Sequence, residues 1–121
     1  MANTFKLKTK ANVGVTTVGI YTAPAATTTV VIGITMTNTS GSGVNVGVGI
    51  TRAGTTEDVK LLKNAPIPQG SSLEFMSGNK IVLEATDTVT VDSDTNNSVD
   101  ASLTIMEITQ RGTHQSYRSG Y

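Results

Sequence analysis

The sequence predicts an all-β fold, an antiparallel β-sandwich of about eight strands in a jelly-roll or immunoglobulin-like arrangement, with polar terminal arms. Apolar and polar residues alternate along many short stretches rich in Val, Ile and Thr, and such alternation is typical of strands with one buried face. Clusters of Gly, Pro, Asn, Asp and Ser separate these stretches at intervals of about 8–12 residues, the spacing typical of sandwiches and barrels. The 121 residues fit one domain.

The clearest alternation lies in residues 28–52 and predicts two long strands joined as an antiparallel hairpin. The residues expected on its apolar faces are Val30, Ile32, Ile34 and Met36 in the first strand and Val44, Val46, Val48 and Ile50 in the second. The run between them, at residues 38–43, consists of Asn, Thr, Ser and Gly, which favour turns. Because each strand presents one apolar face, we expect a second sheet to cover it.

The first strand is expected over residues 5–10, at the edge of a sheet. Phe5 and Leu7 alternate there with Lys6, Lys8 and Lys10. We expect the lysines to face solvent and to protect the edge from pairing with other chains. A nucleic-acid site needs a broader basic patch or interleaved aromatic residues, and Phe5 lies on the opposite face from the lysines.

The remaining strands are each bounded by turn-forming residues. They are expected at residues 16–22, 57–63, 72–76, 80–83, 88–92 and 99–108. Residues 56–64 are the closest candidate for a helical turn. The prolines at positions 66 and 68 predict that residues 66–70 form a loop. In the last strand we expect residues 99, 101, 103 and 105 to face inward, whereas the outer face becomes apolar at Met106 and Ile108.

This pattern predicts a sandwich domain at residues 1–109, with residues 1–15 as a basic strand or arm, and a polar tail at residues 110–121. The formal net charge is zero, but residues 1–56 contain no acidic residue, and all nine acidic residues lie between Glu57 and Glu107. This distribution favours binding of the basic terminal segments of one copy to the acidic middle of a neighbouring copy. The alternative is that exposed strand positions carry these charges without a partner.

Composition argues against several classes of protein. The chain has no cysteine, so disulfides and thiolate metal sites are excluded. We find no signal peptide and no apolar run of the length that a membrane helix needs, and we expect a soluble protein. The single histidine, His114, lies in the polar tail, away from any partner for hydroxyl-based acyl transfer. We expect no enzyme activity and no cofactor.

One loop has the spacing of a metal site. Its candidate oxygen ligands are Asp92, Asp94, Asn96 and Asp100. The first three match the first, third and fifth ligands of a calcium loop. The match then fails, because Asn97 stands where the sharp turn needs glycine and Leu103 stands where a bidentate glutamate is needed. A solvated hairpin loop is the favoured interpretation, and a calcium site is the weaker one.

Four segments resemble recurring patterns in small β-sandwich virion proteins of tailed bacteriophages, including those of the cyanophage type. They are VGIYTAPA at 18–25, IPQGSSLE at 67–74, KIVLEATDTV at 80–89 and SLTIMEIT at 102–109. Thr86 departs from this pattern, since such proteins often have glycine at that place. The resemblance covers most of residues 16–109 and implies a structural component of the virion, assembled in the host cytoplasm in many copies.

Within the virion, the resemblance implies first a capsid decoration or cement protein, a homo-oligomer that binds the major capsid protein and stabilises its subunits. A neck, tail or fibre component is one alternative, and a module that binds host glycans or receptors is another. We expect no nucleic-acid or membrane partner. The residues expected to make the contacts, all in the terminal arms, are Phe5, Lys6, Lys8, Lys10, Arg111, His114, Tyr117, Arg118 and Tyr121.

Overall fold

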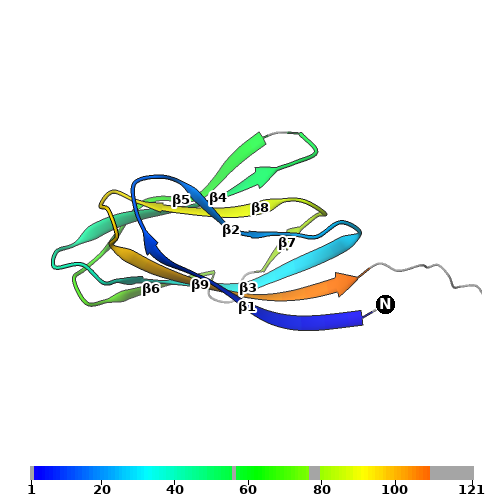
Figure 1. Ribbon diagram of the computed structural model, residues 1–121, viewed down its shortest axis with the longest axis horizontal. Coiled ribbons are helices and arrows are strands. Elements are labelled where there is room, and N and C mark those ends of the chain that lie inside the picture. The colour runs from blue at the N-terminus through cyan, green and yellow to red at the C-terminus, as the bar shows by residue number, and fades with distance from the viewer. Residues whose placement is uncertain (1, 56, 77–79, 110–121) are drawn as a thin grey trace, which may run out of the picture.

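The computed structural model describes residues 2–55, 57–76 and 80–109, which form nine strands in two facing antiparallel sheets (Figure 1). The strands are β1 (Ala2–Val13), β2 (Val18–Thr22), β3 (Thr27–Asn38), β4 (Val44–Arg52), β5 (Glu57–Ile67), β6 (Ser72–Phe75), β7 (Ile81–Leu83), β8 (Thr88–Ser93) and β9 (Val99–Thr109). The predicted β-sandwich is confirmed. Within the described residues there is no helix long and apolar enough to cross a membrane.

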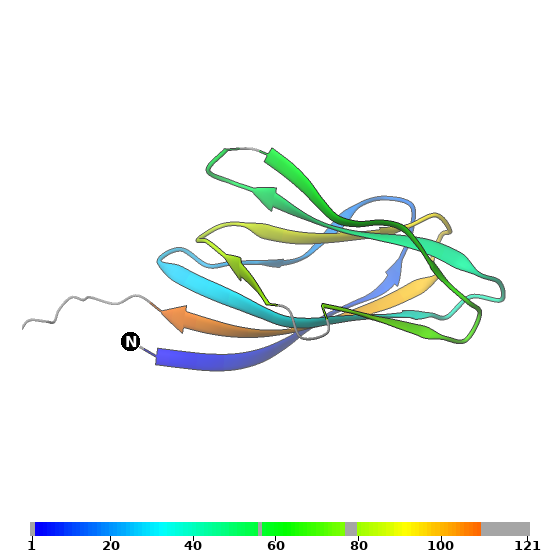
Figure 2. The ribbon, with the colours of Figure 1, turned by 180° about the vertical axis from the view of Figure 1, so that it is seen from behind.

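The strands pair as one long hairpin that is folded over on itself. β1 pairs with β9, β2 with β8, β3 with both β6 and β7, and β4 with β5, all antiparallel. One sheet, the β1 sheet, has the order β1-β9-β3-β6, with β7 also beside β3, and the other, the β2 sheet, has the order β2-β8-β4-β5. Figure 2 shows the same two layers from behind. Nested pairing shared between two sheets is the jelly-roll arrangement, one of the two that the sequence left open.

The hairpin predicted for residues 28–52 is wrong in its pairing, although both of its strands exist. β3 belongs to the β1 sheet and β4 to the β2 sheet, so residues 39–43 cross from one sheet to the other. The apolar faces of the two strands therefore meet across the core, where Met36 and Val46 are both buried. Alternation shows that a strand has one buried face, but it does not identify the strand's hydrogen-bonding neighbour.

A bulge divides the inner face of β3 into two registers. The pairing of β3 with β9 shifts between Val31 and Gly33, which leaves Ile32 as an extra residue in the ladder. The buried residues are Thr27, Thr29 and Val31 before the bulge and Ile34, Met36 and Asn38 after it. The prediction that Val30 and Ile32 share a face with Ile34 is wrong, because the inserted residue reverses the alternation.

The core between the sheets is aliphatic. Its largest fully buried side chains are Ile34, Met36, Ile67, Leu83, Leu103 and Ile105. β4 presents the inner face that was predicted for it, and all four of its alternating apolar residues are buried. Burial of one such aliphatic side chain contributes about 1.5–3 kcal/mol. The stability of the sandwich therefore comes from many small side chains.

β5 is longer than predicted and forms one edge of the β2 sheet. The strand continues to Ile67, so that Pro66 lies inside it, opposite Asn45 of β4, and not in a loop. An edge strand tolerates proline because the missing N–H can face away from the ladder. The possibility of a helical turn near the start of this segment is wrong for residues 57–64, which belong to strand β5.

Two glycines allow β4 to lie very close to its neighbours. A Cβ atom on Gly47 would lie 2.7 Å from Asp92 Oδ1 and 3.2 Å from the Leu62 carbonyl oxygen. A Cβ atom on Gly49 would lie 2.9 Å from the carbonyl oxygen of Val59. A glycine inside a strand often marks such a close approach of another backbone. A side chain at Gly49 would therefore require the backbone of β5 to move, whereas one at Gly47 would first displace the Asp92 side chain.

The turn between β7 and β8 contains a strained residue. Thr86 has a φ angle of 69°, in the left-handed region that a β-branched residue rarely adopts. Its N–H donates to the Ala23 carbonyl oxygen at 2.8 Å, and its hydroxyl donates to the carbonyl oxygen of Ala85. Glycine adopts this conformation without steric cost. The departure from the phage pattern noted in the sequence therefore falls at a position that favours glycine.

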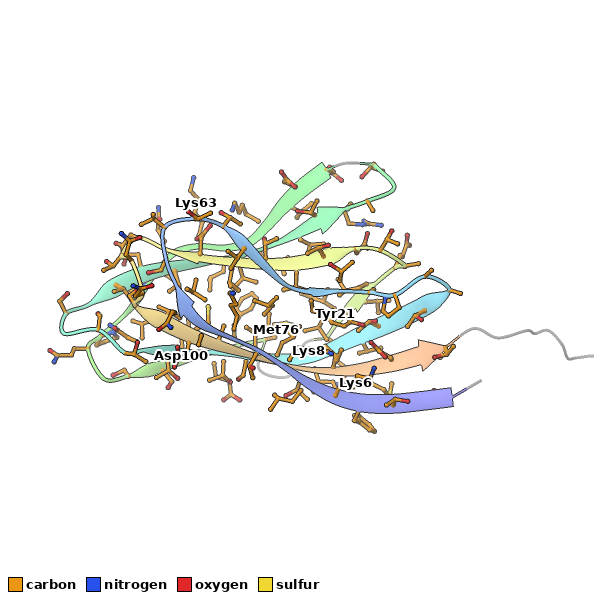
Figure 3. The ribbon with its side chains drawn as sticks, viewed as in Figure 1. Lys6, Lys8, Tyr21, Lys63, Met76 and Asp100 are labelled. Carbon is orange, nitrogen blue, oxygen red and sulfur yellow. The ribbon has the colours of Figure 1, made fainter. Side chains whose placement is uncertain are left out.

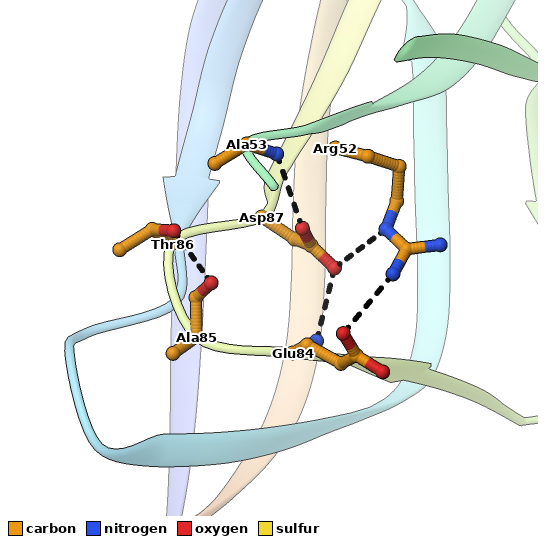
Figure 4. A network of polar contacts seen from close by, with 6 residues as sticks. All are labelled: Arg52, Ala53, Glu84, Ala85, Thr86 and Asp87. Carbon is orange, nitrogen blue, oxygen red and sulfur yellow. Dashed lines mark hydrogen bonds and ion pairs between the residues drawn. The ribbon is translucent and has the colours of Figure 1, made fainter. Parts of the chain in front are cut away.

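Asp87 joins the same turn to the end of β4 (Figure 4). Its carboxylate accepts hydrogen bonds from the backbone N–H of Glu84 at 3.0 Å and of Ala53 at 3.4 Å. Arg52 Nε lies 3.0 Å from Asp87 Oδ2, an ion pair whose geometry falls short of a hydrogen bond, and Arg52 Nη2 donates to Glu84 Oε1 at 3.2 Å. This network fixes the end of the β4 strand against the β7–β8 turn.

Candidate interaction surface

β1 is an edge strand, as predicted, and its lysines lie on the side that faces the opposite sheet. The register pairs Lys6 with Ile105 and Phe5 with Met106 of β9, and directly opposite residues share a face of the sheet. Because Ile105 is fully buried, Lys6 lies on the inner face of the β1 sheet, whereas Phe5 is 69% exposed on the outer face. At this open edge Lys6 and Lys10 remain exposed and Lys8 is half-buried, so the expectation that the lysines face solvent is confirmed for Lys6 and Lys10.

Lys6 closes a cluster of polar side chains between the sheets. Its Nζ lies 2.9 Å from Glu107 Oε1, and the side chain of Glu107 is only 9% exposed. The Tyr21 hydroxyl, which comes from β2 in the opposite sheet, donates to Glu107 Oε2 at 2.6 Å and lies 2.8 Å from Thr29 Oγ1. Figure 3 shows Lys6 and Tyr21 on the two facing layers. The cluster links β1 and β9 to the β2 sheet.

The environment of this cluster separates the pKa values of its two acidic groups. Burial, together with the hydrogen bond to Glu107, raises the pKa of Tyr21 to about 12. The hydrogen bond from Tyr21 holds the pKa of Glu107 below its usual range, assisted by Lys6 and opposed by burial. At neutral pH the carboxylate is therefore ionised and the phenol is protonated.

The outer face of the β1 sheet carries an apolar row that crosses four strands. The register places Phe5 of β1 beside Met106 of β9, Met106 beside Val30 of β3, and Val30 beside Val82 of β7. Leu7 of β1 and Ile108 of β9 lie on the same face in the adjacent rows. We refer to Phe5, Leu7, Val30, Val82, Met106 and Ile108 as the outer apolar face. The prediction that the last strand becomes apolar on its outer side is confirmed.

The outer apolar face is open to solvent. Phe5 is 69% exposed, Leu7 65% and Val82 60%, and the other three residues are half-buried. Farther along the same sheet the surface becomes polar, with Thr9, Ser102 and Thr35 in one row. A shallow depression of about 330 Å³ lies over this polar part. The β1 sheet therefore presents two chemically different halves to the outside.

The acidic loop does not bring its candidate ligands together. Asp92 Oδ2 accepts a hydrogen bond from the Thr17 hydroxyl at 2.9 Å, whereas Asp94 Oδ1 accepts one from the backbone N–H of Asn45 at 3.1 Å. Asp100 Oδ1 accepts one from the N–H of Asn12 at 3.0 Å, and Asn96 is exposed. In the part of the chain that the structure describes, no three acidic or histidine side chains form a group able to hold a metal ion.

The other predicted contact residues are divided between described and undescribed parts of the chain. Lys8 is half-buried and Lys10 is exposed, both on β1. Arg111, His114, Tyr117, Arg118 and Tyr121 lie outside the described residues.

Sequence reasoning missed the roles of Glu107 and Tyr21. A signal was present, because Glu107 continues the inward-facing positions 99, 101, 103 and 105 of the last strand. A carboxylate at a core position needs a partner, and that need pointed to a buried polar cluster. The partner, Tyr21, lies on β2, and no local sequence pattern identifies it.

No protein-family model and no curated protein matches this sequence. Solved structures do resemble the fold. A subunit from a study entitled "Bacillus endospore appendages form a novel family of disulfide-linked pili" has 16% sequence identity and a TM-score of 0.52, covering 89% of this chain and 87% of its own. A chain of the cyanophage Pam1 capsid asymmetric unit has 15% identity and a TM-score of 0.52, covering 86% of this chain and 85% of its own.

A chain from the infectious bursal disease virus Gx strain has 14% identity and a TM-score of 0.54, covering 92% of this chain but only 34% of its own. At these identities the likeness shows a shared jelly-roll fold. Of the chains described here, two come from virus structures and one from a bacterial pilus.

Proposed function

We propose that this protein is a structural component of a virion, namely a capsid decoration or cement protein that binds the major capsid protein. The observation that carries the proposal is the outer apolar face. A well-packed jelly roll leaves Phe5, Leu7 and Val82 in solvent on one side of one sheet, and contiguous exposed apolar surface commonly marks a site of protein interaction. The proposed work of the protein is to bind other proteins through its surface.

Two further findings support a role in the virion. The fold resembles that of a chain in a cyanophage capsid, matched over most of both chains. The sequence segments at 18–25, 67–74, 80–89 and 102–109 independently resemble phage virion proteins. A fold alone supports many functions, so the argument for binding rests on the surface of this chain.

The proposed role is non-catalytic and needs no cofactor. In the buried cluster, Lys6, Tyr21 and Glu107 satisfy one another. A group that exchanges protons in catalysis has a pKa near the working pH, whereas the pKa of Tyr21 is raised to about 12 and that of Glu107 is lowered. Both groups are therefore suited to holding the two sheets together.

Stabilisation of a capsid follows from burial of apolar surface between copies of different proteins. Each square ångström of apolar surface removed from water contributes about 25 cal/mol. This free energy is lost when the decoration protein and the capsid protein separate, so burial opposes their separation. We propose that the protein acts as a symmetric oligomer, since repeated positions on a lattice favour closed symmetry. Because residues 5–10 are paired with β9 within the sheet, only residues 110–121 are proposed to reach neighbouring subunits as an arm.

The experiment that tests this function mixes the purified protein with capsid shells that lack it. We expect saturable, stoichiometric binding in sedimentation and a higher melting temperature of the decorated shells. A chain that ends at residue 109 is expected to bind less tightly. Shells that neither bind the protein nor gain thermal stability would contradict the decoration role, and equal binding by the shortened chain would remove the tail from the contact.

Copy number separates the decoration role from the other virion roles. A quantitative protein profile of purified particles is expected to give copies in numbers comparable to the capsid subunits. A few copies per particle would favour a neck, tail or fibre component instead. Binding of the isolated protein to sugars, without binding to shells, would favour a glycan-binding module.

A further inference from the structure

We propose that the outer apolar face packs against the same face of a second copy of this chain, with the two copies related by a two-fold axis. The contact would lay the β1 sheet of one copy against the β1 sheet of the other. It deepens the proposed function, on which it rests only for the statement that the protein is a symmetric oligomer. It assigns the outer apolar face to the contact within that oligomer, which leaves the rest of the surface and the C-terminal tail to contact the capsid.

Exposure concentrates on this face. Among the described residues the large apolar side chains that are most open to solvent are those of Phe5, Leu7, Val15, Val59 and Val82. The most exposed of them, Phe5 and Leu7, lie together on the outer face of β1, and Val82 lies three strands away in the row of Phe5. A sheet face that only meets water normally carries polar residues. The opposite pattern indicates that this face is covered in the working state.

The lack of net charge on this face favours a second copy of the chain as the partner that covers it. A two-fold axis sets a surface patch against itself, so any net charge on the patch would face its own sign. The paired residues that complete the same rows, Asn3, Thr28, Gly33 and Thr104, are uncharged. The exposed residues two positions before and after Val82, Lys80 and Glu84, carry opposite charges. The lysine side chains of β1 are turned to the inner face, where Lys6 is paired with Glu107. The face is therefore complementary to its own copy.

The free edge of β1 offers the other route for two copies to meet, and its charges oppose that route. Antiparallel pairing of two β1 edges about a two-fold axis keeps each face of the combined sheet continuous. Any register centred between residues 6 and 10 then sets Lys6, Lys8 or Lys10 opposite a lysine of the other copy. Like charges directly opposite destabilise a strand pair. Contact through the face avoids this repulsion.

The size of the face is sufficient for a specific contact. Three rows on four strands, at about 4.8 Å between strands and about 6.8 Å between rows, have a flat footprint of roughly 400 Å². Two such faces with protruding side chains bury roughly 1,000 Å² in total, the lower bound of specific interfaces. We therefore expect reversible self-association that depends on concentration.

The test measures the mass of the full chain by sedimentation over a range of about 1–200 µM, within which a contact of this size is expected to form. The wild type, with a chain mass of 12.6 kDa, is expected to form dimers. Combined Phe5→Glu and Leu7→Glu substitutions are expected to weaken self-association about 100-fold or more by burying charge in the contact. Both residues are exposed, so the variant is expected to keep its fold, which circular dichroism and thermal unfolding check.

Two single variants make the result specific. Val82→Glu changes a strand on the far side of the sheet from β1 and is expected to weaken the dimer as well. Val15→Glu makes the same kind of change at a residue that is 56% exposed and lies between β1 and β2, away from the outer apolar face, and it is expected to leave the dimer intact.

A monomeric wild type, a trimer, or a dimer that survives all these changes would overturn the inference. Loss of the dimer in the Phe5→Glu and Leu7→Glu variant but not in Val82→Glu would assign the contact to the β1 edge and overturn it too. A monomer that still binds capsid shells would leave the proposed function intact and overturn only this contact.

Discussion

The Tyr21 hydroxyl of one sheet donates a hydrogen bond of 2.6 Å to the buried carboxylate of Glu107 in the other. Tyr21→Phe removes this donor and leaves Glu107 Oε2 without it. We expect the free energy of unfolding to fall by about 1–3 kcal/mol, because a buried acceptor then lacks a partner. Urea unfolding measures the change. Thr37→Val, which removes an exposed hydroxyl pair with Ser72, is the control and is expected to change stability by less than about 0.5 kcal/mol.

The same cluster predicts loss of stability at both extremes of pH. The folded-state pKa of Glu107 is lowered, so its contribution is present above pH about 4.3, the ordinary glutamate value, and disappears as the pH falls through the folded pKa. The folded-state pKa of Tyr21 is raised to about 12, so its contribution is complete below pH about 10 and disappears as the pH rises toward 12.

Unfolding curves at a series of pH values test this expectation. Glu107→Gln is expected to flatten the acid limb relative to the wild type, and Tyr21→Phe is expected to flatten the alkaline limb. If both variants kept the wild-type pH dependence, the cluster would not be the source of either loss.

A glycine at position 86 is expected to stabilise the protein. Thr86→Gly relieves a left-handed conformation that costs an L-residue about 1–2 kcal/mol, offset by the greater backbone freedom that glycine has in the unfolded chain. We expect a net gain of about 0.5–1 kcal/mol, measured as a higher urea midpoint. Thr88→Gly, in the neighbouring strand β8, is expected to destabilise. Lower stability of Thr86→Gly would show that the threonine hydroxyl matters more than the backbone strain.

A side chain at Gly49 is expected to push β4 and β5 apart. The new Cβ of Gly49→Ala would lie 2.9 Å from the Val59 carbonyl oxygen and 3.1 Å from Thr90 Oγ1, and such overpacking costs about 1–3 kcal/mol. Gly33→Ala is the matched control, because an added Cβ there meets no atom within 4 Å. That control is expected to be neutral or slightly stabilising. Equal stability of the two alanine variants would contradict the close approach of β5.

The positions of the strands could be predicted from the sequence, but their neighbours could not. Alternation at Val44, Val46 and Val48 correctly gave the inner face of β4. In β3 the same reasoning failed at Ile32, since a bulge depends on how two strands meet and leaves no mark in the alternation of one strand. In β1 the alternation separated Phe5 and Leu7 from the lysines but did not show which side of the strand faces the opposite sheet, since an apolar residue can equally face outward in a protein that binds others.

The candidate surface was predicted only in part. Met106 and Ile108 were expected to form an apolar outer side, and the structure extends that side to Val30 and Val82. This extension depends on the cross-strand register, which joins residues far apart in the chain. The buried partner of Glu107 escaped prediction for the same reason, because Tyr21 reaches it from the other sheet.

The nested order of the strands also has a consequence for synthesis. Ala2 of β1 lies opposite Thr109 of β9, so the first strand of the sandwich can pair only after the ninth strand has left the ribosome. Until then the segment that carries Phe5 and Leu7 has no strand to pair with. Contacts between such distant parts of a chain form slowly. A nascent chain stalled before β9 is therefore expected to depend on chaperones, and mature protein is expected to refold on the slow side for its size.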